Sequence, residues 1–177
     1  TLNEIADLTY SFNTGTENDP ALNLAFNYLS YLGTATRSAE DIAQEMYQLA
    51  CSFNLSSGST QTYISVNGLA ENLPAAMDIV EDLVQNAVPD ENILANLKAD
   101  MLKSRADAKL NQSRCFSALQ RYVLYGPEFI DKVTLSNDEI MAITSEELID
   151  KARSLLGYQH EVLYYGPSSE KQLSELL

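Results

Sequence analysis

The stretch Leu-Ala-Phe-Asn-Tyr-Leu-Ser-Tyr-Leu-Gly-Thr, residues 24–34, decides how the rest of the chain is interpreted. Apolar side chains occur on nearly all sides of residues 21–32, which predicts a helix buried inside the protein rather than lying on its surface. Gly33 is expected to end this helix, because glycine readily adopts the backbone conformation that follows a last helical turn. The segment therefore predicts a core helix around which the other elements assemble.

The segments on either side of this helix predict a strand before it and a second helix after it. Apolar and polar residues alternate over residues 8–13, a period of two that is typical of a half-buried strand, and residues 15–20 predict a turn. Ser38 and Asp41 form a capping box for a helix over residues 39–50, with Asp in place of the usual Glu or Gln. The side chains expected to face inward in this helix are Ala39, Ile42, Ala43, Met46, Tyr47 and Ala50.

The next part of the chain predicts a hairpin followed by a helix. The hairpin covers residues 51–67 and turns at the Ser-Ser-Gly-Ser stretch 56–59. A helix over residues 72–87 shows a clean apolar stripe at helical spacing, and Pro89 breaks it. The stripe consists of Leu73, Ala76, Met77, Val80, Leu83, Val84 and Ala87.

Two more helices are predicted next, the first of them long. It covers residues 90–109 and is capped by Asp90, and the second covers residues 113–125 and ends at Gly126 and Pro127. Their spacing predicts that each buries one apolar face. The side chains expected inside are Ile93, Leu94, Leu97, Met101 and Leu102 in the first helix and Phe116, Leu119 and Val123 in the second.

The last part of the chain predicts two short helices and a strand. Two capping boxes in succession, Ser136 with Glu139 and Thr144 with Glu147, begin the short helices. Residues 161–165 then read as a strand, because they are rich in β-branched and aromatic residues and are bounded by glycines. A last helix is expected to start shortly after this strand.

The order of strand, two helices, hairpin, several helices and strand predicts the α+β fold class. A hairpin requires antiparallel pairing, so we expect a small, mainly antiparallel sheet with helices packed on it. Residues 1–177 are expected to form a single domain. The chain opens with Thr1 and enters a strand pattern almost at once, so we also expect an excised fragment of a larger multidomain protein, with preceding strands missing.

The net charge of −14, from 25 acidic and 11 basic residues, excludes several functions. Binding to nucleic acid or to anionic lipid needs clustered Lys and Arg, and no apolar stretch approaches the ~20 residues that cross a membrane. The acidity is interpreted first as a solvated surface and second as an attraction for basic peptides. Cys51 and Cys115 lie far apart among apolar neighbours, so we expect two small buried side chains rather than a disulfide framework.

Few residues of the chain suit catalysis or metal binding. His160 is the single histidine, whereas a zinc site commonly uses two or three His or Cys, so we expect it to face solvent or to be hydrogen-bonded. Acidic pairs such as residues 40–41 lie in first helical turns, where they complement the helix dipole. Tyrosines are interpreted by default as partly buried core residues, with a peptide-binding surface as the alternative. The tyrosines concerned are Tyr28, Tyr31, Tyr122, Tyr125, Tyr164 and Tyr165.

The frame around the opening helix resembles the pitrilysin/insulinase family of zinc metallopeptidases. In that family a strand ends in an acidic Gly-Ser turn, matched here by residues 15–19, and a motif helix follows, matched by residues 21–32. A Gly-Thr pair and an Arg-Ser segment come next, as at residues 33–34 and 37–38. The order of hairpin and long helices continues as the family implies, so the resemblance covers about residues 8–167.

The H-x-x-E-H zinc motif of this family is replaced at its expected positions. Leu24 stands in place of the first histidine, Asn27 in place of the glutamate and Tyr28 in place of the second histidine. The remote glutamate ligand falls within residues 103–105, Lys-Ser-Arg, which contain no carboxylate. Leucine has no donor atom and an amide cannot accept a proton from water at neutral pH. We therefore expect no catalytic, cofactor-binding or metal site in this chain.

The resemblance implies a non-catalytic domain, and residues 105–109 and 161–167 look most like the third domain of long, four-domain bacterial members. In such an enzyme, zinc lies in the catalytic domain, and catalytic and inactive halves enclose a peptide in a chamber. The implied partners are the other domains and the peptide substrate, and the implied location is the bacterial cell envelope or periplasm. The alternative is a separate inactive subunit that scaffolds or activates a catalytic partner. A third class, an unrelated enzyme, would need a cleft with strongly perturbed carboxylates.

Overall fold

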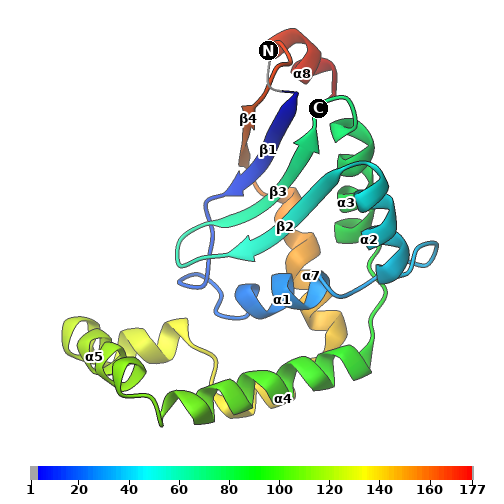
Figure 1. The fold of residues 1–177 in the computed structure, drawn as a ribbon. Helices are drawn as coiled ribbons and strands as arrows, with labels where there is room; N and C mark the ends of the chain where they lie inside the picture. Colours follow the sequence, from blue (N-terminus) through cyan, green and yellow to red (C-terminus); the bar gives the residue numbers. More distant parts are fainter. Residues whose placement is uncertain (1–3, 177) are drawn as a thin grey trace.

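One antiparallel sheet lies at the centre of the computed structural model, which describes residues 4–176 (Figure 1). Its strands are β1 (Ile5–Phe12), β2 (Cys51–Ser57), β3 (Thr62–Leu69) and β4 (His160–Tyr165). Their spatial order is β2-β3-β1-β4, and every neighbouring pair is antiparallel. The predicted hairpin over residues 51–67 is present as β2 and β3, and the first and last strands of the chain pair with each other.

Helices pack on one face of this sheet and extend beyond it (Figure 1). They are α1 (Leu22–Leu29), α2 (Ala39–Gln48), α3 (Leu73–Asn86), α4 (Glu91–Ala108), α5 (Gln112–Val133), α6 (Asn137–Ala142), α7 (Ser145–Ser154) and α8 (Glu170–Leu176), with a short 3₁₀ turn at Leu155–Gly157. The predicted α+β class, with helices packed on a small antiparallel sheet, is confirmed. No helix in the described part of the chain is long and apolar enough to cross a lipid bilayer.

The alternation of side chains in β1 explains why the helices cover one face of the sheet. Ala6, Leu8 and Phe12 are buried, whereas Asp7 and Thr9 between them are partly exposed on the opposite face. Antiparallel sheets commonly bury one face and leave the other in water. The covering layer consists of α1, α3 and α7. Helix α7 contacts both α1 and α3, and α1 and α3 also pack on the hairpin.

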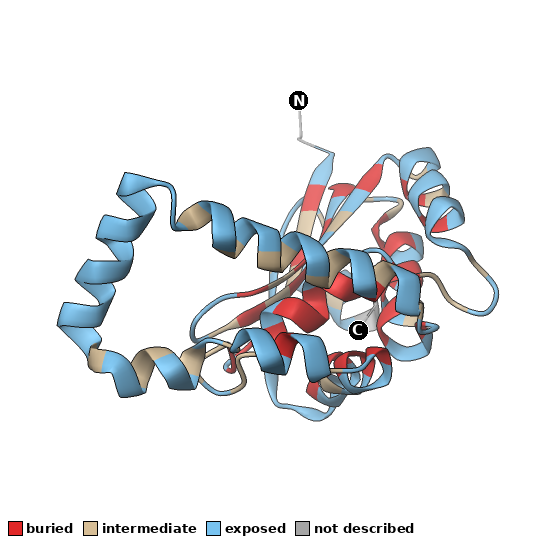
Figure 2. Cartoon of the chain, turned by 90° about the horizontal axis from the view of Figure 1, so that it is seen from below, coloured by how far each residue is buried: buried red, intermediate tan, exposed pale blue. Residues whose placement is uncertain are grey.

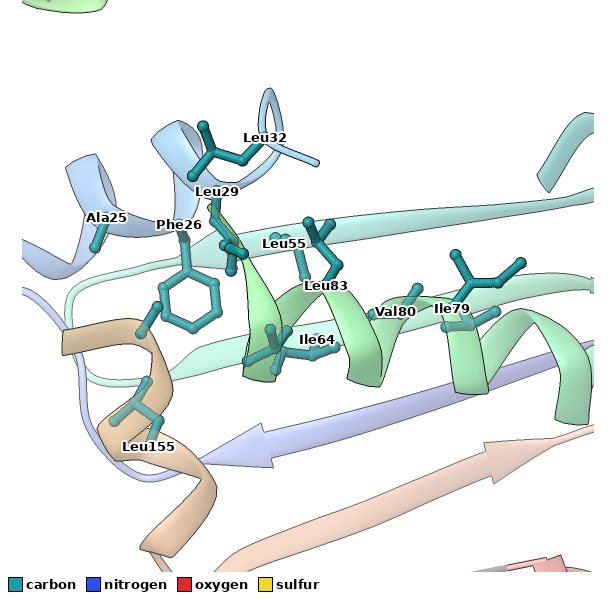
Figure 3. Packing of buried hydrophobic residues seen from close by; sticks show 14 of the residues in the cluster. Ala25, Phe26, Leu29, Leu32, Leu55, Ile64, Ile79, Val80, Leu83 and Leu155 are labelled. Atoms are coloured by element: carbon teal, nitrogen blue, oxygen red, sulfur yellow. The ribbon is translucent and has the colours of Figure 1, made fainter. Parts of the chain in front are cut away.

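The core lies where α1 meets α3 over the hairpin strands (Figure 3). Phe26 and Leu29 of α1 pack against Leu83 of α3 and Ile64 of β3 in one buried cluster. The predicted apolar stripe of α3 is confirmed, since all seven of its residues are buried. Burial of each large apolar side chain contributes roughly 1.5–3 kcal/mol to folding, so this contact is a main source of the domain's stability.

The prediction of a buried opening helix is confirmed, since six of the eight residues of α1 are buried, but one strip of the helix is exposed. Asn23, Asn27 and Tyr31 are exposed, while Leu24 and Tyr28 on the other sides of the same helix are buried. The sequence shows an apolar majority in this segment, but its two asparagines lie four residues apart and therefore share one exposed strip of the helix. This strip makes one side of α1 available for contacts outside the core.

The second helix, α2, is also less buried than its pattern predicted. Ile42 and Met46 are buried, but Tyr47 is 85% exposed. The helix packs against β2, a strand at the edge of the sheet, so a narrow stripe of its surface meets the body. The remaining residues that were expected to face inward are exposed, namely Ala39, Ala43 and Ala50.

The outer part of α4 and all of α5, residues 98–133, form a helical arm that extends beyond the sheet and its helices (Figures 1 and 2). None of these residues is fully buried, and Phe116, Leu119 and Val123, expected inside, are 59%, 57% and 73% exposed. Cys115, also expected to be buried, is exposed, whereas Cys51 is buried as expected. These predictions for the arm are wrong because an amphipathic face requires a covering surface, and residues 4–176 place none over it.

Gly126 divides α5 into two helical segments. Its φ of 76° and ψ of 169° are not helical, and Pro127 follows within the next helical segment. A residue with a Cβ is strained at this positive φ, whereas glycine is not. The break predicted at Gly126 is confirmed, but the helix resumes after it and runs back toward the body as far as Val133.

The helix caps agree with the sequence. Ser38 with Asp41, and two further pairs in α6 and α7, exchange reciprocal hydrogen bonds between side chain and backbone. Asp90 accepts hydrogen bonds from the backbone N–H groups of Asn92 and Ile93 at the start of α4. Each reciprocal cap satisfies two backbone N–H groups that have no partner inside the helix. Short-range signals of this kind were therefore reliable in both halves of the chain.

Candidate functional site

A cleft of about 530 Å³ lies between α1, the tip of the β2–β3 hairpin and the arm. On the body side it is lined by Asn23 and Leu24 of α1, and on the arm side by Arg105 of α4 and by Arg121 and Tyr125 of α5. Because these residues come from segments far apart in the chain, the cleft depends on how the arm is held. This space, the arm cleft, is the candidate site.

The body side of the arm cleft is held rigidly by backbone contacts. The N–H groups of Thr16 and Glu17 donate to the carbonyl oxygens of Gly58 and Ser59 at the hairpin tip, both at 2.9 Å. A Cβ at Gly15 would lie 2.5 Å from the carbonyl oxygen of Gly58, so only glycine permits this approach. Two loops whose bonded residues are 42 positions apart in sequence therefore form one continuous edge.

Two further contacts fix α1 and the arm to the body. Asn23 Nδ2 donates to the carbonyl oxygen of Ser57 at 3.0 Å, which joins α1 to the hairpin tip. On the arm, Lys98 Nζ donates to the carbonyl oxygens of Met141 and Ile143 beside α6. Asn23 thus anchors the body side of the arm cleft, and Lys98 anchors the arm side.

The three positions of the family motif have different surroundings in the structure. Leu24 is 1% exposed and lines the arm cleft. Asn27 is exposed, one helical turn further along. Tyr28 is buried, and its hydroxyl donates to the carbonyl oxygen of Asp90 at 3.0 Å and accepts from the N–H of Asp90 at 2.8 Å. Tyr28 therefore anchors the start of α4 rather than facing the cleft.

These residues do not fit a zinc ion. Leu24 offers no donor atom, and the Tyr28 hydroxyl already exchanges two hydrogen bonds with Asp90. Arg105, in the segment where the family's remote glutamate was expected, lines the arm cleft with a positive charge and donates from Nη1 to Asn137 Oδ1 at 2.8 Å. A zinc site needs thiolate, imidazole or carboxylate ligands. Within residues 4–176, no three His, Cys, Asp or Glu side chains gather to form one.

The charge of the arm is opposite to that of the whole chain. Residues 98–133 hold seven of the 11 basic residues but four of the 25 acidic ones. Two of these basic residues, Arg105 and Arg121, line the arm cleft, whose one acidic residue is Glu17. The sequence analysis missed this because it used the total charge, although the distribution of charge along the chain was visible.

Aromatic and apolar side chains complete the lining of the arm cleft. Tyr125 stacks on Phe129 with ring centroids 5.1 Å apart, and both rings line the cleft together with Met101. Of the six tyrosines considered for a peptide-binding surface, Tyr125 is the one that lines this cleft. Phe129 follows the break at Gly126, beyond which the end of α5 turns back toward the body.

His160 lies away from the arm cleft, at the start of β4. Its Nδ1 is 3.0 Å from the carbonyl oxygen of Tyr158, and its ring packs on Tyr10 and Phe12. The expectation of an exposed, hydrogen-bonded histidine is confirmed. Nearby, burial together with the charge and hydrogen bond of Glu81 raises the pKa of Tyr10 far above its ordinary value. These groups stabilise one end of the sheet.

Three known proteins show what the chain is similar to. An uncharacterized zinc protease of Rickettsia felis is 30% identical over 84 residues, which are 48% of this chain and 20% of that protein. The periplasmic protease PqqL from Escherichia coli matches 98% of this chain and 20% of its own with a TM-score of 0.81 at 15% identity. A peptidase M16 inactive domain from Pseudomonas fluorescens matches 98% of this chain and 44% of its own, with a TM-score of 0.81 at 21% identity. No family model matches the chain.

The fold is that of a peptidase M16 domain. The sequence relatives are zinc proteases, and the predicted resemblance to the pitrilysin/insulinase family of metallopeptidases is confirmed. The matched part of the chain spans about a fifth of the length of the Rickettsia protein. The printed names of these relatives imply zinc in those proteins, whereas the residues at the motif positions of this chain do not fit it.

Proposed function

We propose that this chain is a non-catalytic domain of a zinc metallopeptidase, in which it forms part of the wall around a peptide. The observation that carries the proposal is the use of the motif helix. Leu24 fills the core and Tyr28 anchors α4, so two motif positions have packing roles in place of ligand roles. This chain covers 20% of the protease PqqL, which leaves room for a catalytic domain elsewhere in that protein.

The same residues support the absence of independent hydrolysis. Peptide hydrolysis in this family requires a metal-activated water and a carboxylate that accepts its proton. Asn27 stands at the position of that carboxylate, and its amide cannot accept a proton at neutral pH. In the whole enzyme, zinc and the reacting groups would lie outside this chain.

Zinc binding by the purified chain tests this proposal. We expect no stoichiometric zinc after dialysis against zinc chloride, and no cleavage of an unstructured peptide. The matched control is a variant with Leu24→His and Arg105→Glu, which places an imidazole and a carboxylate in the lining of the arm cleft and is expected to bind more zinc than the wild type. One zinc per wild-type chain, with peptidase activity lost on chelation, would contradict the proposal.

A role as a separate inactive subunit is the second candidate, and the arm is the feature that favours it. Phe116, Leu119 and Val123 form an exposed apolar face on the arm, and such faces mark contact surfaces. In the tethered form the contact would be another domain of the same polypeptide, and in the subunit form a separate catalytic chain. An H-x-x-E-H motif in the same reading frame as this chain would support the tethered form, whereas a motif in a separate gene would support the subunit.

A further inference from the structure

We propose that the arm cleft binds the carboxylate of a peptide through Arg105 and Arg121. The inference rests on the proposed function in one respect, namely that a peptide is the molecule that reaches the cleft. It assigns the cleft a preference for acidic ligands, whereas the net charge of −14 by itself suggests a preference for basic ones.

The two arginines lie on different helices of the arm side of the cleft and have N–H donors without a partner in the described part of the chain. Arg105 is half-buried on α4 and uses Nη1 for Asn137, while Arg121 is exposed on α5. A guanidinium group carries five N–H donors in a planar fork that matches a carboxylate. Neither side chain forms an ion pair within residues 4–176. Two positive groups without an acidic partner therefore face the same space.

The size and lining of the arm cleft suit a short peptide segment. Its volume of about 530 Å³ falls within the roughly 300–1,000 Å³ of known ligand sites, and polar groups contribute more of its lining than apolar ones do. Tyr125, Phe129 and Met101 offer apolar surface beside the arginines, and Asn23 and Thr134 offer hydrogen-bonding groups. A peptide could place an apolar side chain on the stacked rings and a carboxylate between the guanidinium groups.

The charges that line the arm cleft act more strongly on a ligand bound there than the total charge of the chain does. Coulomb interactions between exposed charges are screened over about 8 Å at physiological salt, so acidic residues on the far side of the body act weakly on a ligand in the cleft. Glu17 is the one acidic residue of the lining, against two arginines. The preference for basic or neutral peptides predicted from the total charge thus does not extend to the arm cleft.

Fluorescence anisotropy with rhodamine-labelled peptides and the full 177-residue chain tests the inference. The probe is an unstructured peptide with blocked ends that contains one central Glu among Ala and Phe, and its partner has Gln at that position. We expect the Glu peptide to bind about tenfold more tightly at physiological salt, the ratio that 1.4 kcal/mol produces. Two parts of a peptide can supply the carboxylate, namely an acidic side chain and the C-terminal end of the chain. A third peptide, with Gln and a free C-terminal carboxylate, distinguishes these two sources. Tight binding of this peptide assigns the site to a chain end, and weak binding assigns it to an acidic side chain.

Variants of Arg121 and of a matched arginine outside the cleft show whether Arg121 causes the preference for the Glu peptide. Arg121→Gln is expected to abolish the preference for Glu over Gln, and Arg121→Glu to reverse it toward a Lys peptide. Arg114→Gln removes the same charge from the same exposed helix but does not line the arm cleft, so it should change affinity less than twofold. Equal affinity for the Glu and Gln peptides, or equal losses in Arg114→Gln and Arg121→Gln, would overturn the inference.

These outcomes are separate from those of the zinc experiment. A chain without zinc or activity that also shows no carboxylate preference would overturn this inference and leave the proposed function standing. A chain that binds zinc and cleaves peptides would overturn the proposed function, whereas an Arg121-dependent preference would still establish the binding site. Circular dichroism of each variant shows whether the fold is retained, which is expected because Arg121 and Arg114 are exposed.

Discussion

Two helices of similar sequence character, α3 in the body and α5 in the arm, have opposite surroundings. The seven residues of the α3 stripe are buried between the sheet and α7, whereas no residue of α5 is fully buried. Both patterns are amphipathic, and an amphipathic pattern states that one face of a helix avoids water. It does not state what covers that face. Within residues 4–176 the body supplies its own cover, and the arm does not.

The largest expected contrast between the two regions comes from one phenylalanine in each. Phe26→Ala removes a fully buried ring from the contact of α1 with the sheet and α3, and we expect a loss of about 3–5 kcal/mol in the free energy of unfolding. Phe116→Ala in the arm should cost less than about 0.5 kcal/mol, because the ring is 59% exposed. Urea denaturation measures both. A cost above about 2 kcal/mol for Phe116→Ala would mean that the arm is covered in solution.

Glycines of the two regions provide the second test. Gly15→Ala is expected to cost about 3 kcal/mol, the upper end of the range for overpacking, because the new Cβ would meet the backbone of the hairpin tip. Gly126→Ala meets no atom within 4 Å and bears only the strain of its positive φ, about 1–2 kcal/mol. Denaturation curves of the two variants compare the effects. A larger loss for Gly126→Ala would contradict the rigid contact at Gly15.

The junction of body and arm gives the third test. Tyr28→Phe leaves both backbone groups of Asp90 without the hydroxyl that bonds them, so we expect a loss of about 1–3 kcal/mol. Tyr31→Phe, just after the end of α1, is the control, because Tyr31 is 55% exposed and the substitution should be nearly neutral. Faster proteolysis of the arm in Tyr28→Phe would show that this bond holds α4. Equal stabilities of the two variants would contradict the anchoring role.

The smallest expected effect is the response to acid. Hydrogen bonds with the capping serine or threonine lower the pKa of Asp41, Glu139 and Glu147, mainly from the side chain of Ser38 for Asp41 and from backbone N–H groups for the glutamates. Their stabilising contribution is complete above the ordinary values of 3.8 and 4.5, and it is lost as the pH falls through the lower pKa of the folded state.

Thermal melts between pH 6 and 3 should therefore show falling stability of the body. Glu139→Gln keeps a hydrogen-bond acceptor but does not titrate, so the fall should be shallower in that variant. In the arm, the start of α5 is capped by Asn111, which carries no titrating group, so this cap does not contribute to the fall in stability. A fall of equal slope in the wild type and in Glu139→Gln would contradict the role of this carboxylate.

Features that depend on neighbouring residues in the chain were predictable from the sequence. The cap of α2 at Ser38, the break at Gly126 and the stripe of α3 all follow from residues within a few positions of one another. The resemblance to a known family likewise depended on the order of short segments around Leu24. Each of these signals is local, and the structure contains each of them at the predicted place.

Features that depend on distant packing were not predictable. Tyr47 and Phe116 lie on regular apolar patterns, yet both are exposed because no described element lies over them. The lining of the arm cleft by Arg121 and Phe129 requires the position of α5 relative to α1, which no local pattern contains. Asn23 and Asn27 were visible as polar residues in an apolar segment. Their spacing of four was the signal for an exposed strip on that helix.

The separation of charge described above also gives the domain an electric dipole. Its positive end lies in the arm, where basic residues outnumber acidic ones by seven to four, and its negative end lies in the body, which holds the other 21 acidic residues. A dipole of this kind turns in the field of a charged neighbour before contact occurs. Near an acidic surface the domain would therefore turn its arm toward that surface, and this orientation would weaken as salt is added.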